Sequence, residues 1–244
     1  MPLLQLSQIA GLHFFGLQQG SRHPWVRAMN DSRVEFFRSV VEREQMIQAL
    51  DKNIHEWQPH NASEYLGVSA GCSNELRNCP PWAAVLPWEP FSIDESIARQ
   101  AQGRLHDTQQ YGVSLDISEG SEAFGPSSSA VVRLCAERLM TILTKMQKTG
   151  LRPRAGRLRV VELSSTRMRG LYRSSHFYVE NGQHRAAVYS YLRVKRVSCK
   201  IVARHEMAQI RTWPGVRRGY FDETSAESVF NRIVEQEGPL NQIL

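Results

Sequence analysis

The sequence lacks long hydrophobic runs and is poor in cysteine. No stretch of its 244 residues approaches the roughly 20 apolar residues that a membrane-spanning helix needs. The apolar N-terminus has neither the basic region nor the cleavage site of a signal peptide. The four cysteines are scattered, and the nearest two, Cys72 and Cys79, do not have the spacing of a zinc site. We therefore expect a cytoplasmic protein with reduced thiols and no membrane partner.

Acidic residues are scarce in one part of the chain. Residues 151–218 hold sixteen Lys and Arg but three acidic residues, while the rest holds fourteen basic and twenty-one acidic residues. Concentrated positive charge attracts anions, and the obvious candidates are a nucleotide, a phosphorylated metabolite or a nucleic acid. The alternative is a basic face that contacts solvent alone.

Residues 1–110 have the pattern of a mainly helical N-terminal region. Apolar spacing predicts one helix over 32–56, and a capping box at its start predicts another over 92–110. Between them lies "NCPPWAAVLPWEPF", whose four prolines predict a mostly irregular segment and whose Trp82 and Trp88 can pack against a neighbouring surface. The sequence leaves open whether this region is a separate domain or wraps around the second half.

From residue 111 onward strands and helices alternate, which predicts an α/β (α+β) fold with a small mixed sheet. The order is β, α, β, β, α, β, α, at 111–120, 129–150, 157–165, 176–181, 182–193, 196–203 and 223–238. The helix over 129–150 has the clearest apolar stripe, which includes Cys135, and we interpret that stripe as a core face. Residues 111–244 are therefore expected to form the second domain.

The segment "NGQHR" lies where a predicted strand becomes a predicted helix. The first N–H groups of a helix are unpaired and, with the helix dipole, attract anions. Gly182 lets an anion approach the backbone, His184 can donate a hydrogen bond or exchange a proton, and Arg185 offers a forked cation. These residue types suit a phosphate group bound by residues 182–185. In the alternative interpretation Arg185 simply pairs with a nearby acid.

With its flanks, this motif resembles the ParB/sulfiredoxin superfamily over about residues 111–204. The runs that carry the resemblance are "MQKTGLRP", "RLRVVEL" and "HFYVENGQHRAAVYSYLRVKRVSCKIV". The resemblance implies a nucleotide-phosphate site at Gly182, Gln183, His184 and Arg185. The ParB-like free-serine kinases, with Asp-Gly-His-His-Arg, are the most similar members, although Asn181 replaces the acid and Gln183 the first histidine. Gln183 also stands where sulfiredoxins have their reactive cysteine, which argues against sulfinic-acid reduction.

The resemblance to these kinases implies a small-molecule kinase that uses ATP or ADP with Mg²⁺ and phosphorylates a hydroxyl acceptor. Such kinases keep a catalytic glutamate between the first strand and first helix, where this chain has Glu119 and Glu122. Basic residues that can hold an anionic substrate group are Arg167, Arg169 and Arg173. Two alternatives remain: a non-catalytic nucleotide-sensing or DNA-binding protein, and a structural or assembly protein with a degenerate site.

Overall fold

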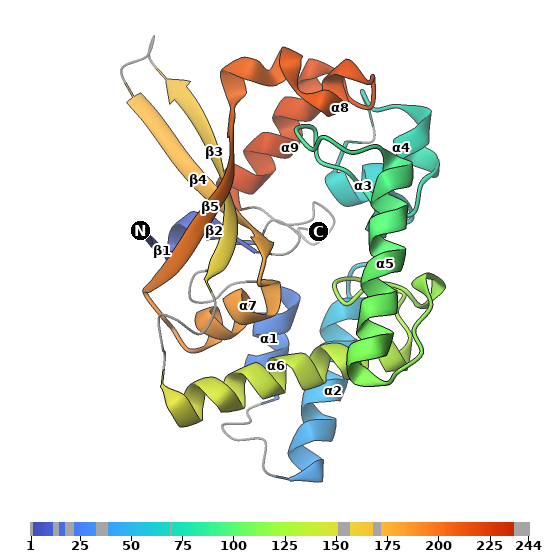
Figure 1. Ribbon diagram of the computed structural model, residues 1–244, viewed down its shortest axis with the longest axis vertical. Coiled ribbons are helices and arrows are strands. Elements are labelled where there is room, and N and C mark those ends of the chain that lie inside the picture. The colour runs from blue at the N-terminus through green and yellow to red at the C-terminus, as the bar shows by residue number, and fades with distance from the viewer. Residues whose placement is uncertain are drawn as a thin grey trace.

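A computed structural model describes residues 2–11, 15–17, 22–32, 39–68, 70–150, 157–167 and 172–236 (Figure 1). Its strands are β1 (Leu3–Gln5), β2 (Ile9–Ala10), β3 (Leu158–Arg167), β4 (Tyr172–Asn181) and β5 (Arg196–Glu206). Its α-helices are α1 (Pro24–Asp31), α2 (Val40–His55), α3 (Ala62–Leu66), α4 (Asn74–Asn78), α5 (Ile93–Tyr111), α6 (Ser129–Thr149), α7 (Gln183–Tyr191), α8 (Pro214–Arg217) and α9 (Glu223–Glu235). Short 3-10 helices include η3 (Pro81–Ala83), η4 (Ile117–Glu119) and η5 (Met207–Thr212). Among the described helices, none is long and apolar enough to cross a lipid bilayer.

The strands form one mixed sheet in the order β1-β5-β3-β4-β2. β3 and β4 are an antiparallel hairpin, and β5 lies parallel to β3 on its other side. The edges come from the N-terminus, since β1 pairs with β5 and β2 pairs with β4. The prediction of a mixed α/β fold is therefore confirmed.

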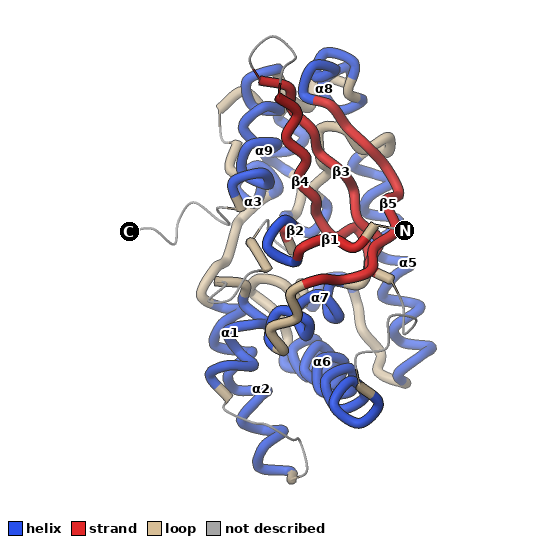
Figure 2. Tube along the Cα trace, turned by 90° about the vertical axis from the view of Figure 1, so that its left-hand side faces the viewer, coloured by secondary structure: helices blue, strands red, loops and turns tan. Residues whose placement is uncertain are grey.

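Both faces of the sheet are covered, which explains why its strands are apolar at successive positions. On β3, Leu158 and Val160 pack towards the N-terminal segment and α7, while Val161 and Leu163 pack towards α9 and the proline-rich segment. Figure 2 shows α9 and α3 on one side of the strands and α7 below them. A further helical layer of α1, α2 and α6 then covers α7.

Residues before and after position 110 share the same cores. Trp88, from the proline-rich segment, is 2% exposed, and its Nε1 donates a hydrogen bond of 2.9 Å to Tyr178 Oη on β4. Its ring meets that of Trp213 edge-on, with 5.2 Å between centroids. Because the first 110 residues supply two strands and about half of the two largest core clusters, they wrap around the second half.

Local signals located α5, α6, α7, α9 and the strands β3 to β5, although β4 starts at Tyr172 rather than at 176, and β1, β2, α1, α4 and α8 had no predicted counterpart. The capping box of Ser92 and Glu95 starts α5 as expected, and Ser128 caps α6. The strand predicted over 111–120 is wrong, because that segment is an extended turn with η4, and Asp116 caps the first N–H groups of η4. The described part of the helix predicted over 32–56 is α2, which begins at Val40, where Ser39 and Glu42 form a capping box, and residues 33–38 lie outside the described residues.

The shared core predicts the stability of one tryptophan variant. Trp88→Ala should lower the free energy of unfolding by about 3–5 kcal/mol, because it leaves a large cavity and deprives the Tyr178 hydroxyl of its donor. Urea unfolding followed by circular dichroism measures the change. Trp82→Ala is the matched control, since Trp82 is only partly buried at a pocket wall, and it should cost less than about 1.5 kcal/mol. Equal losses of unfolding free energy in the two variants would show that Trp88 contributes no more to the core than Trp82 does.

Candidate functional site

The helix predicted at the motif is present. Gly182 has φ 96° and ψ 26°, in the left-handed region that favours glycine, and α7 starts at the next residue. Its carbonyl accepts the first helical hydrogen bond, from the Ala186 amide, at 2.9 Å. Every other described helix of eight or more residues has a side-chain cap, whereas α7 has none. The first N–H groups of α7 thus have no side-chain acceptor and can receive a ligand.

The start of α7 opens onto a pocket of about 590 Å³. The other walls of the pocket come from α5, from the segment around η3 and from the loop that follows η4. Lining residues from these elements and from α1, α3, α6, the start of α7 and the end of β4 include Trp25, Tyr65, Trp82, Arg104, Asp107, Glu122, Phe124, Arg138, Asn181, Gly182, Gln183 and His184. A volume of this size suits a small-molecule ligand.

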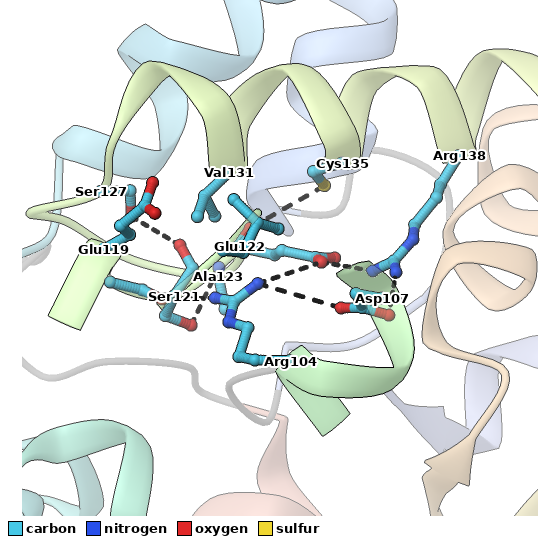
Figure 3. Close-up of polar contacts among 12 residues, drawn as sticks. Arg104, Asp107, Glu119, Ser121, Glu122, Ala123, Ser127, Val131, Cys135 and Arg138 are labelled. Atoms are coloured by element: carbon cyan, nitrogen blue, oxygen red, sulfur yellow. Dashed lines mark hydrogen bonds and ion pairs between the residues drawn. The ribbon is translucent and has the colours of Figure 1, made fainter. Parts of the chain in front are cut away.

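Glu122 lies where α6, α7 and the loop after η4 meet. Its Oε2 is 2.9 Å from His184 Nε2, and its Oε1 accepts a hydrogen bond from Arg138. Arg104, on α5, is 3.8 Å from the same Oε1 (Figure 3). The Glu122 side chain is only 13% exposed. A carboxylate this buried requires cationic partners, and the two arginines supply them.

The two arginines belong to one ion network. Arg138 also donates to Asp107, and Arg104 donates to the Gly120 carbonyl and lies 4.0 Å from Asp107 (Figure 3). The four charged side chains of this network, on Arg104, Asp107, Glu122 and Arg138, are 12–18% exposed. Two positive and two negative groups balance, so the network adds no net charge to the pocket wall.

The surroundings of Glu122 determine its acidity. Burial raises the pKa of its carboxyl, but the hydrogen bond with His184 and the charges of His184, Arg138 and Arg104 outweigh burial. The pKa of Glu122 therefore lies below its ordinary value. A carboxylate held ionised in this way is a weak proton acceptor, although it remains a good partner for a cation.

His184 is fixed on three sides. Its ring stacks on Trp25, with 4.2 Å between centroids and 20° between planes, and Trp25 Nε1 donates to the Glu122 carbonyl at 2.7 Å. Its Nε2 is also 3.6 Å from Cys135 Sγ. Helix α1 thereby holds both the imidazole and the loop that carries Glu122, so the two groups cannot separate without disturbing Trp25.

Glu119 does not share this pocket. Its Oε2 accepts from Ser128 Oγ at 2.7 Å, and its Oε1 accepts from the Asp116 amide at 3.1 Å. The Ser128 hydrogen bond, followed by that from Asp116, holds the pKa of Glu119 below its usual value. Glu119 is absent from the residues that line the pocket. Of the two acids expected to act in catalysis, the structure brings Glu122 to the motif and uses Glu119 to join η4 to α6.

The remaining motif residues occupy different positions around the start of α7. Gln183 Nε2 donates to the Val179 carbonyl, while its buried Oε1 has no hydrogen-bond partner among the described residues. Arg185 does not line the pocket, and its hydrogen bond to the Arg157 carbonyl is long at 3.4 Å. A bond of this length is weak, so it would not prevent the Arg185 side chain from binding a stronger acceptor near Gly182.

Two of the three arginines expected to hold a substrate lie on strands away from this pocket. Arg167 and Arg173 are at the far end of the β3–β4 hairpin, paired with Tyr172 and Thr166 respectively. Eight strand residues separate Arg173 from Gly182, a backbone distance of roughly 25 Å. Figure 1 shows that end of the hairpin at the opposite end of the strands from α7. Arg169 lies outside the described residues.

Sequence reasoning missed several pocket residues. Arg104 and Asp107 sit one helical turn apart on α5 and so share a face, and this spacing was the available signal. Arg138 and Trp25 offered no comparable signal, because each resembles an ordinary member of an amphipathic helix. Cys135 was interpreted as a core residue, and it is indeed fully buried within the core stripe of α6.

Comparisons with known proteins assign the chain to no family. No protein-family model matches the chain, and no curated protein or solved structure matches it.

The buried ion network predicts the effect of removing one arginine. Arg138→Met should lower the free energy of unfolding by about 3 kcal/mol, because Glu122 and Asp107 lose their closest cation in a site shielded from water. Denaturant unfolding at neutral pH measures the loss. Arg133→Met, on the same helix, is the control: Arg133 pairs with Glu44 at the surface, and its loss should change stability little. Equal losses of unfolding free energy in the two variants would show that the pocket network stabilises the protein no more than a surface ion pair does.

Proposed function

We propose that the chain is a nucleotide-binding phosphotransferase, a small-molecule kinase that moves a phosphoryl group from ATP or ADP to a hydroxyl acceptor. One observation carries the proposal. The start of α7, with its uncapped N–H groups, and Glu122, far away in the sequence, line the same pocket. The Glu122–His184 distance of 2.9 Å brings the acid expected from the kinase resemblance against the motif expected to bind phosphate.

The pocket offers separate places for the two ends of a nucleotide. Terminal phosphates would lie on the amides at the start of α7, where the helix dipole favours negative charge. Tyr65, Trp82 and Phe124 supply aromatic surface that suits a planar base. Since the ion network is already neutral, a nucleotide would bring its own Mg²⁺ to balance its phosphates.

The acceptor would bind beside Glu122. This carboxylate is the acid that the loop after η4 contributes to the pocket, and it replaces the acid missing at Asn181. Its role would be to accept a hydrogen bond from the acceptor hydroxyl and so orient it, rather than to take up its proton. Arg104 and Arg138 hold it in position from two helices, so its geometry is set before substrate arrives.

One observation favours a second candidate, a non-catalytic nucleotide-sensing protein. The contacts that keep Glu122 ionised satisfy its charge within the protein, so the pocket can hold a ligand without carrying out a reaction. Both candidates require nucleotide binding, and turnover separates them.

Nucleotide affinity should depend on Arg185. Arg185→Ala is expected to weaken ATP or ADP binding by about 1.5–3 kcal/mol, because a charge-assisted hydrogen bond to phosphate is lost. Titration calorimetry of the folded variants measures the affinity. Arg193→Ala is the control, since Arg193 follows the other end of α7 and lines a different pocket. No nucleotide binding by the intact protein, or equal effects of both variants, would contradict the proposed site.

Turnover should depend on Glu122. With candidate hydroxyl acceptors, ATP should yield ADP, or ADP should yield AMP, and Glu122→Gln should slow this by about 100-fold while nucleotide affinity changes little. Glu119→Gln is the control and should leave the rate nearly unchanged, since Glu119 lies outside the pocket. Nucleotide binding without turnover on any acceptor would favour the sensing alternative.

A further inference from the structure

Three different donor groups converge at the inner end of the pocket. Glu122 Oε2, Cys135 Sγ and His184 Nε2 all lie within 4.8 Å of one another. The closest two are Glu122 Oε2 and His184 Nε2, at 2.9 Å, and Cys135 Sγ is 3.6 Å from the same nitrogen. Ligand atoms of a tetrahedral metal ion, each about 2.0–2.3 Å from it, stand at comparable separations from one another.

The arrangement argues against a nucleophilic triad. In a Cys-His-acid triad the thiol and the acid contact opposite nitrogens of the imidazole, so that the acid orients the ring while the other nitrogen accepts the thiol proton. Here Glu122 and Cys135 both face Nε2 of His184. Cys135 is also fully buried and does not line the pocket, so its sulfur is not presented to a substrate. Convergence on one nitrogen is what a shared metal ion would require.

The ligand types select the class of metal. A thiolate, an imidazole and a carboxylate are together typical of Zn²⁺ and its neighbours in the first transition series, whereas Mg²⁺ prefers oxygen ligands alone. A divalent ion with one thiolate and one carboxylate has no net charge, which lowers the cost of burying it. We propose that Glu122, Cys135 and His184 bind a zinc-class metal ion, with a fourth coordination position open to the pocket.

The residues around the cluster support this geometry. Glu122 uses Oε1 for Arg138, which leaves Oε2 for a metal. Arg138 is balanced in turn by Asp107, so its positive charge does not face the metal uncompensated. His184 and Glu122 line the pocket, whereas Cys135 lies behind them. A fourth ligand, water or a substrate oxygen, must therefore arrive from the pocket side. The Trp25 ring stacked on His184 holds the imidazole in its orientation.

This inference goes beyond the proposed function, because it needs no nucleotide. A pocket that binds metal but no nucleotide would leave the site assignment intact and remove the kinase proposal. Nucleotide binding by a protein that takes up no zinc-class metal would do the reverse.

Cobalt titration tests the site directly. Untagged protein freed of metal with a chelator is titrated with Co²⁺, whose thiolate complexes absorb in the near ultraviolet and whose tetrahedral complexes absorb strongly in the visible. The intact protein should show both absorptions, and Zn²⁺ should abolish them by displacing Co²⁺. Cys135→Ser should remove the thiolate band and weaken binding by at least about 100-fold, since loss of a ligand exceeds the loss of its supporting contact.

A matched thiol serves as the control. Cys199 is also buried, at 1% exposed, but its Sγ contacts the Val197 carbonyl in the sheet, and Cys199→Ser should keep the full spectrum. The proposal is overturned if the folded intact protein gives no thiolate band, if the band survives in Cys135→Ser, or if Cys199→Ser loses it equally.

X-ray absorption of the intact zinc-loaded protein covers the case in which Cys135→Ser does not fold. One sulfur at about 2.3 Å and nitrogen or oxygen ligands at about 2.0–2.1 Å are expected. A first coordination shell of zinc that contains no sulfur would overturn the assignment without the use of any variant.

Discussion

The contact between Glu122 and His184 is the constraint around which the pocket is organised. It joins the loop after η4 to the first turn of α7, and both partners are held from behind, Glu122 by Arg138 and His184 by Trp25. Through these contacts α1, α5, α6 and α7 all depend on one buried carboxylate. Its ionised state determines where the arginines point and what the pocket can bind.

Buried ion networks of this kind stabilise a protein little. Each charge loses its hydration, and the attraction between the charges barely offsets that loss of free energy. Apolar side chains of similar size would fill the same space at less cost. The chain instead places two arginines and two acids beside a cavity, with 12–18% of each side chain exposed. Perturbed and mutually neutralised groups in a cleft are typical of functional sites. The network is therefore better explained by the position it gives Glu122 than by its contribution to folding.

The sheet and the helical layers supply the rigid frame for this arrangement. On the inner side of α7, Ala186, Ala187 and Val188 are buried. Their small side chains let the helix approach both the sheet and α6. The N-terminal residues complete the frame by forming both sheet edges. A site at the start of α7 is consequently held by segments from distant parts of the chain. The residues that line its pocket come from α1, α3, α5, α6 and α7, from the end of β4 and from the segments around η3 and η4.

The sequence by itself determined the elements whose causes are local. Capping residues and apolar periodicity located α5, α6 and α7, because these signals act within a few residues, and the glycine of the motif marked the strand-to-helix turn. The mixed α/β class followed from the alternation of these patterns. The strand predicted over residues 111–120 was wrong because a short alternating run is compatible both with a strand and with a turn that contains a capped 3-10 helix. The tertiary structure alone decided that the N-terminus supplies both sheet edges, that Glu122 and not Glu119 reaches the pocket, and that Cys135 lies beside His184. Cys135 has the periodicity of a core residue, and local spacing cannot reveal which side chain from another helix lies opposite a buried thiol.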